Sequence, residues 1–287
     1  MNKLCAIAAF TALLAACGST TDDETGSGGS APTIPSNSTV SVGDVEGISY
    51  NGNTLRVRVP LDGNSQLETY EADGELNGYQ RFTQTESAAN RSFTALAGRS
   101  DDGNLVAAVV ADGGQFNRFY GGAILEQNNF SAPAGGLVSY QGNYVGLVNY
   151  GPGTTAPGAP DVIARGEATG VTGSVFLTAD FADNKVEGAV YDRYIEGGAA
   201  LDDLVLIVGD VAADGTFDGA IELNDATNTG AGSYSGAFGG SDAAFAGGVL
   251  DISSSAYGAG ADPNTKEYGI FVIGQCPGSN AESCFTP

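Results

Sequence analysis

The chain has 287 residues, of which 44 are glycine, and it contains no histidine and no tryptophan. Hydrophobic residues make up 42% of it, which is enough for a packed core and argues against disorder along the whole length. With 11 basic and 34 acidic residues, the formal net charge is −23. A surface this acidic repels phosphate backbones, so we expect no nucleic-acid partner.

Residues 1–16 are expected to be a signal peptide. Lys3 supplies a positive charge, and the apolar run that follows from Leu4 to Ala16 is too short to span a bilayer. The run ends in Leu-Ala-Ala-Cys, which resembles the lipobox of bacterial lipoproteins. That resemblance implies cleavage before Cys17, a diacylglycerol on its thiol and, because Gly18 follows, transfer to the outer membrane. The alternative is an ordinary secretory signal followed by a chance cysteine.

Residues 17–47 are expected to form a lipidated, flexible tether. Residues 18–47 contain no aromatic side chain and are rich in Ser, Thr, Gly and Asp. A coil of this composition has a root-mean-square reach of about 30 Å, which would hold the folded part away from the membrane.

Cys276 and Cys284 remain after Cys5 leaves with the signal peptide and Cys17 takes the lipid. In an exported protein, two such cysteines around a short turn predict a disulfide, which would contribute about 2–3 kcal/mol. A metal site is the alternative, but two cysteines without histidine supply too few ligands. We expect neither a metal nor a cofactor.

The folded part shows short stretches of alternating apolar and polar residues between turn-forming residues, which predicts an antiparallel all-β fold. The first is Leu55, Val57 and Val59, alternating with arginines. Further expected strands are Leu105–Ala111, Phe116–Leu125, Leu137–Tyr150, Ser174–Phe181, Val186–Tyr191, Leu204–Gly209, Thr216–Leu223, Ser233–Gly239, Ala244–Ile252 and Tyr268–Gly274. Closing such a meander into a barrel removes its exposed edges.

Two regions are expected within the folded part. The stretch APAGG at residues 132–136 would separate a β-rich region over 48–136 from a barrel over 137–287, and GPGTTAPGAP at 151–160 would be a loop. Most arginines precede that loop, which supports the division.

The many glycines are explained as packing residues of a small barrel, where large inward side chains from neighbouring strands crowd one another. Within Leu137–Tyr150, the even positions alternate Tyr or Val with Gly, as a filled barrel interior requires. For the same reason, Gly236 and Gly239 beside Phe238 are expected to relieve crowding inside the barrel. A ligand site built from the tyrosines is the alternative.

Three stretches resemble the β-barrel domain of the transferrin-binding protein B family of surface lipoproteins, whose relatives include factor H-binding and haemoglobin-binding lipoproteins. SYQGNYVG resembles the first barrel strand, with Tyr144 where the family often has Trp. GSVFLTADFADNKVEGAV resembles a strand ending in Asp-Phe, a tight turn and a returning strand. GTFDGAIEL and GSYSGAFGGSDAAFAGGVL resemble the glycine–phenylalanine hairpin, with Ala244 or Phe245 in place of the usual acidic residue.

The resemblance covers roughly residues 137–275 and implies an eight-stranded barrel beside a smaller β-rich handle. It also implies a surface-exposed lipoprotein that binds a host protein or an iron-related ligand. Without histidine, an iron or haem site that uses imidazole is ruled out. We assign no ligand-contact residue.

No catalytic constellation is found. Without histidine there is no Ser-His-Asp or Cys-His pair, and GSYSG has Tyr234 where a nucleophile elbow needs serine. The acidic segments Asp210–Asp214 and Asp101–Asp102 lack calcium-loop spacing, and nothing singles out a carboxylate pair for glycoside hydrolysis. We therefore predict a non-enzymatic lipoprotein that binds a protein or small ligand and passes it to an outer-membrane receptor. The alternative is a structural or coat lipoprotein without a dedicated ligand.

Overall fold

The fold is all-β, as predicted. A computed structural model describes residues 38–60, 67–86, 91–113, 119–150, 168–224, 226–258, 260–279 and 284. Besides strands, these residues form the short 3-10 helices η1 (Ser241–Ala243), η2 (Ser254–Tyr257) and η3 (Pro277–Ser279). Within those ranges, no helix has the length and hydropathy of a membrane span.

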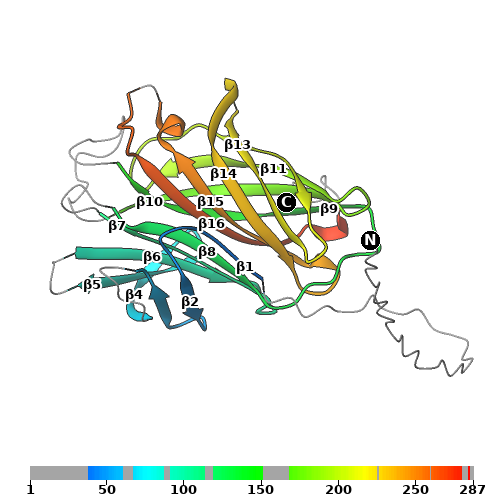
Figure 1. The fold of residues 1–287 in the computed structure, drawn as a ribbon, viewed down its shortest axis with the longest axis horizontal. Coiled ribbons are helices and arrows are strands. Elements are labelled where there is room, and N and C mark those ends of the chain that lie inside the picture. Colours follow the sequence, from blue (N-terminus) through cyan, green and yellow to red (C-terminus); the bar gives the residue numbers. More distant parts are fainter. Residues whose placement is uncertain are drawn as a thin grey trace, which may run out of the picture. The chain divides into compact units, whose positions relative to one another are not determined.

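Eight C-terminal strands close into an antiparallel barrel, which confirms the barrel prediction (Figure 1, green to red). They are β9 (Leu137–Asn149), β10 (Thr169–Asp180), β11 (Lys185–Ile195), β12 (Leu204–Val211), β13 (Thr216–Leu223), β14 (Ala226–Gly239), β15 (Phe245–Ser253) and β16 (Lys266–Gln275). Each strand pairs with the next along the chain, and β16 closes the barrel by pairing with β9. Every barrel strand is therefore paired on both sides, which leaves no exposed strand edge.

Eight N-terminal strands form a second antiparallel sheet in the order β1-β8-β7-β6-β5-β4-β3-β2 (Figure 1, blue to green). They are β1 (Ser38–Gly43), β2 (Gly47–Tyr50), β3 (Leu55–Arg58), β4 (Glu68–Leu76), β5 (Tyr79–Glu86), β6 (Arg91–Arg99), β7 (Leu105–Asp112) and β8 (Gly121–Gln127). The first strand, β1, thus lies at one edge of the sheet and β2 at the opposite edge. The strands β3 to β8 then follow in order across the sheet until β8 pairs with β1.

The expected tether over 17–47 is wrong at its C-terminal end. Residues 38–43 form β1, which pairs with β8, and β2 already begins at Gly47. Val40 and Val42 pack against a hydrophobic core of the sheet. The valines alternate with Ser and Gly, a strand pattern that the Ser- and Thr-rich composition conceals. The first 37 residues, including the signal peptide and Cys17, lie outside the described ranges.

Four further strands had not been expected: β2, β4, β5 and β6. In β4, ETYEADGEL, only Tyr70 is buried, so the strand lacks the apolar alternation from which strands are predicted. It forms because its backbone pairs with β3 and β5. The strand expected at Phe116–Leu125 is β8, which runs from Gly121 to Gln127, while residues 114–118 lie outside the described ranges.

Strand β7, the third strand from one edge of the sheet, is buried on both faces. Leu105 and Val109 join a core with Val145 of β9 and Val249 of β15, so this face of the sheet packs on the barrel wall. On the opposite face, Val110 packs in a separate core formed within the sheet. The sheet and the barrel therefore share one hydrophobic core, while each also has a core of its own.

Candidate functional site

The barrel interior is filled by its own side chains. As predicted, the even positions of β9 face inward, where Tyr140, Tyr144 and Val148 join one large apolar cluster. Glycine makes room for these rings: a Cβ on Gly269 of β16 would overlap the hydroxyl of Tyr144. The interior tyrosines are thus packing residues of the barrel, as the sequence indicated.

A fully buried ion pair lies inside this apolar cluster. Arg193 of β11 and Glu267 of β16 have side chains with 0% exposure, and Arg193 Nη2 lies 2.5 Å from Glu267 Oε2. Arg193 Nη1 also donates to the carbonyl oxygen of Asp202 at 2.8 Å. A buried charge needs both a counter-ion and hydrogen bonds, and this pair supplies them across the barrel.

Two tyrosines complete the cluster around Glu267. The hydroxyl of Tyr144 donates to Glu267 Oε1 at 2.6 Å, and that of Tyr257, in η2, donates to Glu267 Oε2. The carboxylate therefore accepts three charge-assisted or hydroxyl hydrogen bonds from three different parts of the barrel.

The electrostatics keep both tyrosines neutral and the arginine charged. Burial, followed by the nearby Glu267 carboxylate, raises the pKa of Tyr144 and of Tyr257 well above the ordinary value. Burial, the largest single effect, would lower the pKa of Arg193, but Glu267 together with Tyr257 and Tyr144 outweighs it, and the pKa is raised. The cluster is sealed from solvent, and its hydrogen bonds tie β9, β11, β16 and η2 together, so its role is structural.

A hairpin of the N-terminal sheet docks on the barrel wall beside Tyr144. Asn77 and Gly78 form the two-residue turn between β4 and β5 with φ of 48° and 86°, a turn for which Asn-Gly is favoured. The side chain of Asn77 donates to the carbonyl oxygens of Tyr144, at 3.0 Å, and Gly173, at 2.8 Å. Asn143 returns a hydrogen bond to the Asn77 carbonyl.

Tyr79, the next residue of the hairpin, bridges an opening in the barrel ladder. The β9–β16 pairing runs from Phe271↔Tyr144 to Gly274↔Gln141 with no pair between. Within this interval, the Tyr79 hydroxyl accepts from the Val272 N–H at 2.8 Å and donates to the Asn143 carbonyl at 3.0 Å. One side chain of the sheet thus satisfies backbone groups of two barrel strands.

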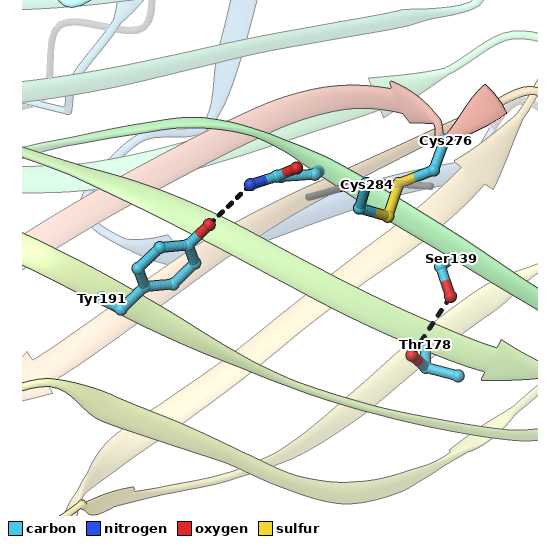
Figure 2. The surroundings of a disulfide bond; sticks show 6 residues. Ser139, Thr178, Tyr191, Cys276 and Cys284 are labelled. Atoms are coloured by element: carbon cyan, nitrogen blue, oxygen red, sulfur yellow. Dashed lines mark hydrogen bonds between the residues drawn. A yellow bond between two sulfur atoms is a disulfide. The ribbon is translucent and has the colours of Figure 1, made fainter. Parts of the chain in front are cut away.

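The two cysteines predicted to pair do so in the structure. Cys276 and Cys284 form a disulfide with Cα atoms 5.0 Å apart (Figure 2). The Cys276 N–H donates to the carbonyl oxygen of Ser139, so the bridge fixes the segment after β16 beside the start of β9. Ser139 and Thr178 of the adjacent strand point toward each other next to it (Figure 2). Within the described ranges, no group of His, Cys, Asp or Glu side chains is arranged to hold a metal ion.

The two glycines expected to face the barrel interior face opposite sides of the barrel wall. A Cβ on Gly236 would collide with the ring of interior Phe217 and with the Gly247 carbonyl. On Gly239 it would lie 2.6 Å from the Leu105 side chain, which belongs to the N-terminal sheet. The expectation was therefore wrong for Gly239, because strand alternation turns residues 236 and 239 to opposite faces.

Sequence reasoning missed Arg193 and Glu267. Glu267 and inward-facing Phe271 are four residues apart on β16, so strand alternation puts both on the inner face, and this pattern could have indicated Glu267 from the sequence. Arg193 has the opposite parity to inward-facing Val190, and only a bulge at Asp192, with φ of 50°, turns it inward. Alternation alone would therefore have placed Arg193 on the outer surface.

Comparison with known proteins gives matches in structure alone. No family model and no curated protein matches the sequence. A double mutant of transferrin-binding protein B from Haemophilus parasuis is similar at 14% identity and a TM-score of 0.48, covering 83% of this chain and 44% of that one. The isotype 1 transferrin-binding protein B of Neisseria meningitidis is similar at 14% identity and a TM-score of 0.43, over 83% and 43%.

The N-lobe of lactoferrin-binding protein B from Moraxella bovis is similar at 14% identity and a TM-score of 0.37, covering 63% of this chain and 79% of that one. This chain spans less than half the length of the two transferrin-binding proteins. Transferrin-binding protein B is also the family that the sequence motifs of the barrel strands resemble.

Proposed function

We propose that this chain is a non-enzymatic lipoprotein of the outer membrane that binds a protein ligand on the outside of its folded part. The observation that carries the proposal is the filled barrel interior. Residues of all eight barrel strands pack there around the buried Arg193–Glu267 pair. A barrel of this kind is a rigid body that offers its wall and loops to a partner rather than its lumen.

The anchor belongs to the same proposal and rests on the sequence. The lipobox-like segment ending at Cys17 supplies the lipid, and the residues between Cys17 and β1 supply the spacer. A Cys17→Ser chain should lose fatty-acid labelling and accumulate as precursor or soluble protein. Labelling that persists in this variant would refute the anchor while leaving ligand binding open.

The binding function is tested with the lipidated chain held in detergent on a sensor surface. Growth medium and host fluid are passed over it, beside the same chain unfolded by heat as a control. We expect one protein to bind saturably to the folded chain only. An absence of saturable binding from every fluid would favour the alternative of a structural or coat lipoprotein.

The soluble part used in any such experiment should retain β1. A fragment beginning at residue 48 removes β1 and β2's first residue and leaves the hydrogen-bonding edge of β8 without its partner. An unpaired strand edge recruits other chains, so that fragment would give spurious binding.

A further inference from the structure

The outer wall of the barrel carries the exposed large apolar side chains. Among the described residues, these are Leu137 at 63%, Val208 at 55% and Tyr194 at 49% exposure. Tyr194 and Val208 lie on the paired strands β11 and β12, whereas Leu137 lies on β9, which β10 separates from β11. Single exposed apolar side chains are ordinary on a protein surface, but Val208 has other apolar residues beside it on the outer wall.

A bulge in β12 places two apolar residues side by side on the outside. The β11–β12 pairing passes from Val186↔Gly209 to Gly188↔Leu206, so Ile207 and Val208 together oppose a single residue of β11. Leu206 is in the interior cluster, whereas Ile207 and Val208 are outside it. Bulges commonly re-aim side chains at functional positions, and this one brings both residues to the outer surface.

The apolar surface continues across the two strands before β12. Phe176 of β10 pairs with Ala189 of β11, and Ala189 pairs with Val205 of β12. All three are partly exposed and lie outside the interior cluster. We call the outward surface of Phe176, Ala189, Val205, Ile207 and Val208 the apolar stripe. It crosses three strands without a charged residue among its members.

Carboxylates surround the apolar stripe. Asp180, Glu187, Asp210, Asp218 and Glu222 lie on β10–β13 at outward positions. The single lysine nearby, Lys185, is in an ion pair with Asp210. The rim is therefore strongly negative around an uncharged centre.

We propose that the apolar stripe and its acidic rim dock a basic protein, one that presents an apolar side chain amid Lys and Arg. This deepens the proposed function and rests on it. Negative potential steers and orients a basic partner, and burial of the stripe supplies the contact energy. A second copy of this chain would add another −23 charge, and an anionic membrane would be repelled in the same way. Because the barrel is closed, the partner binds through side chains and not by adding a strand.

Photo-cross-linking with the full lipidated chain locates the contact. Benzoylphenylalanine replaces Val208 in one chain, Ile207 in a second and, as the control, exposed Glu71 of β4 in a third. Each is irradiated in intact cells with the fluid that yields binding. We expect one basic protein to be cross-linked from positions 208 and 207 but not from position 71.

Charge variants then test the chemistry with that cross-linked protein as the probe. The chain with Glu187→Lys and Asp218→Lys should bind it at least tenfold more weakly. The control with Glu71→Lys and Glu75→Lys has the same net charge and should bind within twofold of the wild type. Val208→Lys should also weaken binding tenfold or more, and raising the salt concentration should weaken binding to the wild type.

The outcomes separate this inference from the proposed function. The docking surface is overturned, while the binding function stands, if saturable binding survives the Glu187→Lys, Asp218→Lys and Val208→Lys substitutions and the cross-links come from position 71 or elsewhere. An acidic partner, a second copy of this chain or lipid at position 208 also overturns it. Failure of any protein to bind overturns both.

Discussion

Removal of Arg193 should destabilise the barrel more than any surface ion-pair change. In an Arg193→Met chain, the Glu267 carboxylate stays fully buried and keeps only the Tyr144 and Tyr257 hydroxyls as partners. Breaking a buried pair from one side costs about 3–5 kcal/mol, because an uncompensated charge remains. At about 2–4 °C per kcal/mol for a domain of this size, the melting temperature should fall by about 6–20 °C.

The measurement is guanidinium denaturation followed by circular dichroism, with Lys185→Met as the matched control. Lys185 and Asp210 form an ion pair whose side chains are 50% and 85% exposed, and such pairs contribute about 0–1 kcal/mol. The double variant Arg193→Met with Glu267→Gln should cost clearly less than the sum of its two single variants, because it removes both charges. The reasoning is refuted if Arg193→Met lowers the free energy of unfolding no more than Lys185→Met does.

Three further results are expected. Gly236→Val should lower the free energy of unfolding by about 1–3 kcal/mol through overpacking. An unchanged melting temperature would contradict this, because it would mean that the side chains around residue 236 move aside without loss of stability. Mass spectrometry of unreduced peptide should show Cys276 and Cys284 joined and two hydrogens lighter than the dithiol, whereas two free thiols in protein from the cell envelope would contradict this. Because the pKa values of Tyr144 and Tyr257 are raised in the folded chain, their hydroxyl protons dissociate at a lower pH in the unfolded chain than in the folded one. Stability should therefore be unaffected by them below about pH 10 and fall as pH rises above it, and denaturation curves that coincide at about pH 9 and about pH 11 would contradict the assignment.

Much of the fold could be read from alternation along the strands. The inward side of β9 was predicted residue by residue, since its tyrosines and glycines keep strict parity. Bulges limited that approach, because each one reverses the parity of all residues after it: the bulge at Asp192 moves Arg193 inside. The charged partner of Glu267 could therefore not be found from sequence.

Other features depended on contacts between distant segments. Gly239 packs against Leu105 of a different sheet, and Tyr79 bonds to backbone groups of β9 and β16. Neither contact leaves a periodic mark in the local sequence. β1 was missed for another reason, since two valines among small polar residues carry too weak an apolar signal.

The Tyr79 bridge makes the barrel and the N-terminal sheet dependent on each other during opening. If the sheet detaches, the Val272 amide loses its acceptor inside the β9–β16 ladder. Its hydrogen would then exchange with solvent while the amides of neighbouring pairs such as Phe271↔Tyr144 stay protected. The exchange rate of the Val272 amide therefore reports how often the N-terminal sheet detaches from the barrel. Amides in the ladder on the far side of the barrel keep their hydrogen bonds during this motion, so their exchange rates do not report it.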